Sequence, residues 1–201
     1  MYEIYLQSFV LYFVVIDPFG TTPIFMSLTK HQNAKEKIKS ALEGVLTATI
    51  ILIFFSIVGN FLLSYLNISL GAFKIAGGII LFIISLEMLF DKRQERKEKD
   101  IEIVSSNIAI FPLAIPLLSG PAAITSVIVI VSQFGDNLTY QLISNISLLC
   151  VMLITFILFF IVSKSQQFIN KKVINVFSRV IAIVLAGLSI QYFIDGVISL
   201  I

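Results

Sequence analysis

Two stretches interrupt the hydrophobic segments of this chain: Asp17-Pro18-Phe19-Gly20-Thr21-Thr22-Pro23, and Pro116-Leu117-Leu118-Ser119-Gly120-Pro121-Ala122-Ala123. They lie roughly one hundred residues apart. Proline removes a backbone donor, and glycine weakens a helix. Inside a bilayer, the freed backbone groups are tolerated only where protein or a wet cavity satisfies them. Two such breaks at corresponding positions of two halves are typical of a transporter's solute site.

The composition indicates a membrane protein. The chain has 201 residues, of which 58% are hydrophobic and 13% are charged. In a soluble domain, about a quarter of the residues are charged. We therefore predict an all-α, polytopic membrane protein whose solvent is the bilayer.

Six apolar segments are each long enough to cross a bilayer as a helix: residues 4–29, 41–65, 69–90, 107–133, 138–163 and 176–200. A crossing needs about twenty helical residues. The first and fourth segments contain the two breaks. We therefore predict six transmembrane helices, of which the first and the fourth are discontinuous.

The basic residues predict the orientation. They gather after the first, third and fifth segments, at Lys30, Lys35, Lys37, Lys39, Lys92, Arg93, Arg96, Lys97, Lys99, Lys164, Lys171, Lys172 and Arg179. The other side has Lys74 alone. The positive-inside rule then places these connections in the cytoplasm and both termini outside, in a prokaryotic cytoplasmic (inner) membrane.

A charged connection divides the chain into residues 1–90, a linker at 91–106, and residues 107–201. Its acids and bases nearly cancel, which favours a solvated connector over a patch for nucleic acid or anionic lipid. Three spans in each half require the second half to be inverted. The third span of each half begins with a cation, Lys74 or Arg179, followed by a stripe of small residues that allows close helix packing. The two stripes are Ala76-Gly77-Gly78, and Ala182, Ala186 and Gly187.

At the first break, Asp17 is a good N-cap and Pro18 suits the first position of a new helix. Gly20 relaxes the backbone there. Thr22-Pro23 offers a second helix start. The half-helix then begins near the bilayer midplane, with its unpaired N–H groups and positive dipole end facing the interior.

At the second break, Gly120 is expected to take the left-handed conformation that ends one half-helix, and Pro121 to start the next. Pro112 and Pro116 predict that the entering half-helix is distorted. Hydroxyls come from Ser119, Thr125 and Ser126, and small side chains from Ala122 and Ala123.

Together the breaks form a candidate site for a small zwitterion, with donors for its carboxylate and acceptors for its ammonium. Its residues are Asp17, Pro18, Phe19, Gly20, Thr21, Thr22, Ser119, Gly120, Pro121, Ala122, Ala123 and Thr125. The alternative is that the prolines only kink ordinary helices. Three roles stay open for Asp17: a structural cap, a partner of the ammonium, and a coupling-ion site.

Enzyme signatures are absent from the sequence. A single histidine, His31, and a single cysteine, Cys150, form neither a zinc motif nor a Cys/His pair. Glu43, Glu87 and Asp195 lie nearer the helix ends, where interfacial or paired roles are favoured over a proton path. We expect no enzyme, no metal and no cofactor.

The two interrupted motifs resemble those of the MarC family of integral membrane proteins, which includes the SnatA small neutral amino-acid transporters. The strings Asp17–Phe25 and Pro116–Ile124 carry the resemblance, and Lys74–Leu81 and Arg179–Gly196 fit the third and sixth helices. Asp17 stands where many members have Asn, and Lys74 where Arg is frequent.

The resemblance implies a six-span cytoplasmic-membrane transporter built of inverted repeats, which binds glycine, alanine or serine at the breaks. We expect alternating access coupled to H⁺ or Na⁺, with H⁺ favoured. The expected partners are the amino acid, the ion, membrane lipid and a second copy in a homo-oligomer, but no nucleic acid. Two alternatives stay open: an exporter of another small solute, and a non-transporting interaction or regulatory membrane protein.

Overall fold

The computed structural model describes residues 1–90, 108–133, 137–164 and 171–200, with the side chains of 171–175 left aside. Within these ranges the regular elements are all helical, which confirms the all-α prediction. They are α1 (Tyr2–Ile16), α2 (Pro18–Leu28), α3 (Ala34–Tyr65), α4 (Leu70–Leu89), η1 (Ala109–Leu118), α6 (Pro121–Ser132), α7 (Leu138–Lys164) and α8 (Lys171–Ile198).

The helices match the six apolar segments predicted from the sequence. Five helical spans are long and apolar enough to cross a membrane, counting α1 and α2 as one span. The pair η1 and α6 makes a sixth, bent by 54° at its break. The predicted linker at 91–106, with its five basic residues, lies outside the described residues. Lys171 and Lys172 begin α8, and their side chains are also outside the description.

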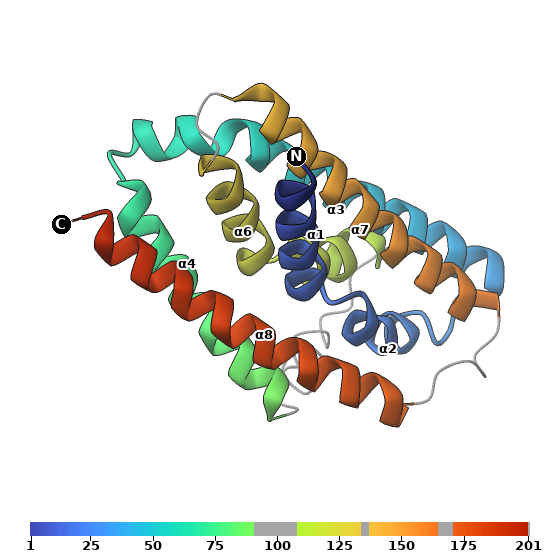
Figure 1. Ribbon diagram of the computed structural model, residues 1–201. Helices are drawn as coiled ribbons and strands as arrows, with labels where there is room; N and C mark the ends of the chain where they lie inside the picture. Colours follow the sequence, from blue (N-terminus) through green and yellow to red (C-terminus); the bar gives the residue numbers. More distant parts are fainter. Residues whose placement is uncertain (91–107, 134–136, 165–170, 201) are drawn as a thin grey trace.

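The bundle has two ends (Figure 1). At the end we call the termini end lie the starts of α1, α4 and α7 and the finishes of α3, α6 and α8. The starts of α3 and α8 and the finishes of α2, α4 and α7 lie toward the opposite end. Successive spans therefore run in opposite directions, as a chain that crosses a membrane repeatedly requires.

Two pairs of long helices enclose the interrupted ones. The pair α4 and α8 lies along one side, and the pair α3 and α7 along the other, with α1, α2 and α6 between them (Figure 1). Buried apolar residues from both broken spans form the centre of the core, among them Leu11, Ile16, Ile24, Leu118 and Val127. The first break therefore lies in the protein interior, while the second lies partly at the surface, with Pro116 and Pro121 exposed.

Most helix contacts of the two halves correspond, although the contacts of α1 with α8 and of α6 with α7 have no counterpart of similar extent among the described residues. Suppose that α1–α2 is exchanged with η1–α6, α3 with α7, and α4 with α8, and let α1·α7 stand for the contact between α1 and α7. The contact α1·α7 then becomes η1·α3, and α2·α7 becomes α6·α3. The same exchange converts α4·α6 into α8·α2, while α3·α7 and α4·α8 map onto themselves. This correspondence favours the predicted two-fold relation between residues 1–90 and 107–201, which stays a prediction.

The α4–α8 pair is held by close backbone approach. A Cβ added to Gly78 would lie 2.7 Å from the Ser189 carbonyl oxygen and 3.0 Å from the Phe193 amide nitrogen. A Cβ on Gly196 would lie 2.7 Å from the carbonyl oxygen of Gly71. Small residues at such crossings let helices pack tightly where lipid removes the hydrophobic driving force. A Cβ built on Gly187, part of the predicted small-residue stripe of the sixth span, would have no neighbour within 4 Å among the described residues, so Gly187 does not contribute to this packing.

This packing predicts a contrast between two glycines. Gly78→Ala should destabilise the protein by about 1–3 kcal/mol, because the methyl group would force the α4 and α8 backbones apart. Gly187→Ala, in open space on α8, should leave the melting temperature in detergent unchanged or slightly raised. Equal melting temperatures for the two variants would contradict the assigned packing.

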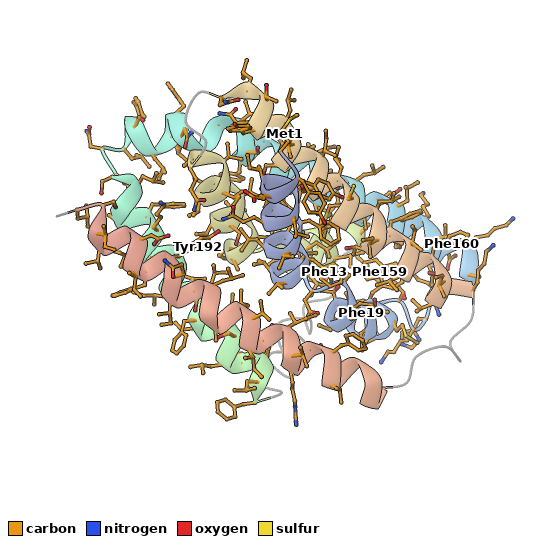
Figure 2. All side chains as sticks on the ribbon, in the orientation of Figure 1. Met1, Phe13, Phe19, Phe159, Phe160 and Tyr192 are labelled. Carbon is orange, nitrogen blue, oxygen red and sulfur yellow. The ribbon has the colours of Figure 1, made fainter. Side chains whose placement is uncertain are left out.

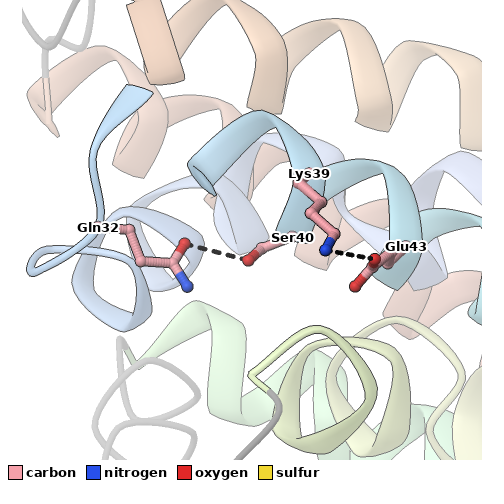
Figure 3. Close-up of polar contacts among 4 residues, drawn as sticks. All are labelled: Gln32, Lys39, Ser40 and Glu43. Atoms are coloured by element: carbon pink, nitrogen blue, oxygen red, sulfur yellow. Dashed lines mark hydrogen bonds and ion pairs between the residues drawn. The ribbon is translucent and has the colours of Figure 1, made fainter. Parts of the chain in front are cut away.

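A polar cluster fixes the start of α3 (Figure 3). Asn33 and Glu36 form a reciprocal capping box. The Ser40 hydroxyl donates to Gln32 Oε1 at 3.1 Å, and Lys39 Nζ lies 3.7 Å from Glu43 Oε1. Glu43 is therefore paired, as the sequence analysis favoured.

Candidate functional site

Asp17 connects α1 and α2 at the first break. It has φ 53° and ψ 69°, a left-handed conformation that asparagine and aspartate adopt more readily than most residues. Its N–H donates to Phe13 O at 3.0 Å and closes α1, while its carbonyl accepts the Thr21 N–H at 2.9 Å and opens α2. Its Oδ1 accepts the Gly20 N–H at 3.0 Å. Asp17 is thus the N-cap of α2, as predicted, and it is buried, with 3% of its surface exposed.

The prolines and threonines after Asp17 complete this turn. Pro18 occupies the first turn of α2, as predicted, and Pro23 lies inside the helix, so of the two possible helix starts the structure uses Asp17-Pro18 and not Thr22-Pro23. The Thr21 hydroxyl donates to Asp17 O at 2.9 Å, and the Thr22 hydroxyl donates to Pro18 O at 2.7 Å. These hydroxyls therefore satisfy carbonyls of their own helix.

Aromatic rings line one side of the first break. Phe13 at the end of α1 meets Phe19 at the start of α2 edge-on, with ring centroids 6.1 Å apart (Figure 2). Phe19 also stacks on Phe177 of α8 at 5.8 Å. Phe19, a predicted site residue, thus ties the break to the flanking α4–α8 pair.

The second break is built differently. In η1, Phe111 and Ile115 have extended backbone angles, and the peptide bonds that precede Pro112 and Pro116 are cis. The Ser119 N–H and hydroxyl both donate to Ala114 O, at 2.9 and 2.8 Å. The predicted distortion of the entering half-helix is confirmed. Because of it, Ala109–Leu118, the first part of the segment predicted at 107–133, is not a regular α-helix.

Gly120 does not take the left-handed conformation predicted for it. Its φ of −75° and ψ of 175° are extended, because it serves as the N-cap of α6 and not as the C-cap of the preceding segment. The reason for a glycine here is space: an added Cβ would lie 2.5 Å from the carbonyl oxygen of Pro116. Close approach of two backbones, and not a left-handed angle, requires Gly120.

The start of α6 presents backbone donors. Pro121 stands in its first turn as predicted, and no side chain in the described part of the chain caps this helix. The first intrahelical bond runs from the Ile124 N–H to Gly120 O at 3.1 Å, so the N–H groups of Ala122 and Ala123 precede it. Both alanines are buried. The start of α6 therefore offers two backbone N–H donors at the positive end of the helix dipole.

Thr125 and Ser126 lie one turn into α6. The Thr125 side chain is buried against α4, where a Cβ on Gly77 would come within 2.5 Å of its methyl carbon. The Ser126 hydroxyl is fully buried, and within the described residues it has no hydrogen-bond partner. Ser126 shares a helix face with Ala122, four residues earlier. Gly77 was not in the predicted site, since its small-residue stripe indicated only packing.

The structure brings the two breaks together in part. α1 contacts α6, and α2 contacts η1, so the two broken spans pack against each other. Eight of the twelve predicted residues are buried, Phe19, Gly20 and Gly120 are half-buried, and Pro121 is exposed. The assignment of these residues to solute binding stays a prediction.

No group of three or more His, Cys, Asp or Glu side chains is placed to hold a metal ion anywhere in the ranges that the structure covers. His31 is exposed in the turn between α2 and α3, and Cys150 is a half-buried free thiol in α7.

Comparison with known proteins gives one family. Residues 2–201 match the family described as "MarC family integral membrane protein". No solved structure matches the chain.

Relatives cover nearly the whole chain. A UPF0056 membrane protein of Methanocaldococcus jannaschii is 33% identical over 98% of this chain and 87% of its own length. A UPF0056 membrane protein of Aquifex aeolicus is 33% identical over 98% of this chain and 94% of its own length. The UPF0056 membrane protein YhcE of Escherichia coli is 30% identical over 98% of this chain and 93% of its own length. The sequence motifs, the broken spans and the full-length match lead to one conclusion: the chain belongs to the MarC family of integral membrane proteins.

Proposed function

We propose that this protein is a secondary transporter of small neutral amino acids, which moves glycine, alanine or serine across the cytoplasmic membrane by alternating access. The observation that carries the proposal is the pair of half-helix starts, at α2 and α6, in two broken spans that contact each other within a bundle of apolar helices. Discontinuous spans with helix ends at the membrane centre are the usual solute sites of secondary transporters.

The two helix starts differ in charge, and the difference orients the solute. At α2 the Asp17 carboxylate already caps the helix, so a second carboxylate is disfavoured there and an ammonium is favoured. At α6 no side chain caps the helix. The Ala122 and Ala123 N–H groups therefore take the solute's carboxylate, an interaction worth up to ~2 kcal/mol when partly buried.

The mechanism follows from the helix arrangement. The broken spans lie between the α3–α7 pair and the α4–α8 pair, and they contact both. Rocking of one half against the other would open the site to each side in turn, with an inward gradient of H⁺ or Na⁺ as the driving force. The predicted orientation, with both termini outside, fixes which side is which.

The test is uptake of radiolabelled glycine, alanine and serine into proteoliposomes, with pH and sodium gradients imposed separately. We expect accumulation that depends on one of the two gradients. Flux of another solute that these amino acids do not compete with would favour an exporter of different specificity. No substrate-dependent flux, with substitutions at both breaks tolerated, would favour a non-transporting regulatory protein.

Size selectivity gives a second test. Ala122→Val should weaken uptake of alanine and serine about tenfold more than uptake of glycine, because each added methyl group competes with the solute side chain. Ala76→Val, the same change at an exposed position of α4, is the matched control and should leave the ratio unchanged. The measurement is the ratio of KM values for alanine and glycine, and an unchanged ratio in Ala122→Val would remove α6 from the site.

A further inference from the structure

A polar pair lies on the outward side of α8. Gln191 Nε2 donates to Asp195 Oδ1 at 2.7 Å, one helical turn away, and the Gln191 side chain is exposed. α8 packs mainly on α4 and lies along one edge of the bundle (Figure 1). Ser189, whose carbonyl oxygen lies against Gly78 of α4, is about 160° away from Gln191 around the helix. Gln191 is therefore directed away from the rest of the protein.

This pair lies deep in its span. The apolar span of α8 is Val176–Ile198, so its middle residue is Gly187. At 1.5 Å per residue, Gln191 lies about 6 Å and Asp195 about 12 Å from that middle. Both depths fall inside a hydrocarbon core that extends about 15 Å to each side. Polar and ionisable side chains within a span almost always face a bundle interior or one another. An amide that points outward at this depth therefore indicates that another helix covers it.

The outward sides of the other long helices differ from this one. Within about 12 Å of the middle of α3, α4 and α7, the exposed residues are all apolar, among them Phe54, Ile83 and Leu153. Lipid tails suit such surfaces. Gln7 of α1 is exposed too, but it lies in the first two turns of a helix that starts at Tyr2, near the membrane surface. The outward side of α8 is thus the surface that lipid tails suit least.

We propose that a second copy of this protein covers this surface, so that the α8 helices of two copies pack side by side around Gln191. Most soluble and membrane dimers of identical chains are symmetric, and symmetry brings the same patch of both copies together. Two copies inserted in one membrane have the same orientation, so their α8 helices run parallel. Gln191 of one copy then meets Gln191 of the other at the same depth.

The chemistry of the amide supports this choice of partner. One N–H of Gln191 is bonded to Asp195, while its second N–H and its oxygen have no partner among the described residues. An amide is both donor and acceptor, so two Gln191 side chains can form two equivalent hydrogen bonds with each other. Gly187, one turn away on the same side, adds no side chain, and small residues, alanine included, let two helices approach closely. Lipid tails offer neither donor nor acceptor.

The dimer does not rest on the proposed transport function, because each copy contains both breaks. The first test therefore measures association alone. Copies labelled at the N-terminus with a donor or an acceptor fluorophore are reconstituted into liposomes over a range of protein-to-lipid ratios. We expect energy transfer that rises linearly with the acceptor fraction, as a dimer gives. Gln191→Leu should raise the dissociation constant of the dimer about tenfold, because two hydrogen bonds between helices are lost.

Gln7→Leu is the matched control, since it makes the same change at the exposed glutamine near the start of α1. It should leave the dissociation constant unchanged. Wild-type energy transfer no greater than random proximity produces would overturn the dimer. An equal dissociation constant in Gln191→Leu and the wild type would overturn the role of α8.

The second test keeps Gln191, in case its variant fails to insert. In a Cys150→Ala background, Ile198→Cys places a thiol on the same side of α8, two turns after Gln191. Leu138→Cys at the start of α7 is the control, because both positions lie at the termini end and are 67% and 72% exposed. A short bismaleimide should join Ile198→Cys into dimers several-fold faster than Leu138→Cys. Equal rates, or no dimer at either position, would contradict the proposed contact.

Discussion

Gly120→Val is expected to abolish amino-acid uptake while the protein still inserts in the membrane. The reason is local. A Cβ at Gly120 would lie 2.5 Å from the Pro116 carbonyl oxygen, and this contact is with backbone that has no rotamer to change. Overpacking of this kind costs about 1–3 kcal/mol, and here it would push α6 away from the end of η1.

Displacement of α6 would move the Ala122 and Ala123 donors out of register with Asp17 across the site. A misplacement of about 1 Å at a binding constellation is enough for a large loss of function. Gly120→Ala carries the same first carbon and should give most of the effect. Initial uptake rates in proteoliposomes, normalised to the amount of inserted protein, measure both.

Gly187→Val is the control, because Gly187 of α8 has nothing within 4 Å of a built Cβ. It should insert and transport as the wild type does. Wild-type glycine uptake by Gly120→Val would remove the second break from the solute site, even if the fold were right.

The fold was predictable because it depends on patterns that a bilayer imposes. The six segments follow from length and hydrophobicity, and Asp17-Pro18 predicted a helix end and a helix start that the structure has. The conformation of Gly120 was not predictable in the same way. A glycine before a proline fits a left-handed C-cap as well as an N-cap, and only the nearby Pro116 carbonyl, positioned by η1, selects the second.

The roles of the hydroxyls were the least predictable part of the site. Thr21, Thr22 and Ser119 read as ligand groups in the sequence, but each bonds to a carbonyl of its own segment. Ser8 and Ser56 lie in apolar stretches with no sequence signal for a site, and within the described residues their buried hydroxyls have no hydrogen-bond partner. A sequence gives no rotamer, so it cannot distinguish a hydroxyl that satisfies its own helix from one that faces another element.

Substitutions at Asp17 should separate its three roles. Asp17→Asn keeps an acceptor for the Gly20 N–H and tolerates the left-handed angle, so the free energy of unfolding should stay within about 0.5 kcal/mol of the wild type. Asp17→Gly keeps the angle and loses the side-chain cap, at a cost of a few tenths of a kcal/mol. Asp17→Ala loses both and should cost about 2–3 kcal/mol, the sum of a lost cap and a strained left-handed residue.

The order of the three variants in transport should differ from their order in stability, because transport also depends on the charge of residue 17. Asp17→Ala should lose uptake together with stability. Asp17→Asn should fold normally and raise the KM for glycine tenfold or more. Two unit charges about 4 Å apart attract each other by about 4 kcal/mol at an effective dielectric constant of ~20, and each 1.4 kcal/mol lost is about tenfold in affinity. Denaturation in detergent and uptake kinetics on the same preparations measure the two effects.

The contrast between the two readouts identifies the role of Asp17. A wild-type KM in Asp17→Asn would leave Asp17 as a cap alone and refute the orientation proposed for the solute. Loss of the dependence on the pH or sodium gradient, with binding retained, would assign Asp17 to the coupling ion. If Asp17→Asn were as unstable as Asp17→Ala, the cap itself would be refuted, because the amide oxygen accepts the Gly20 N–H as the carboxylate does.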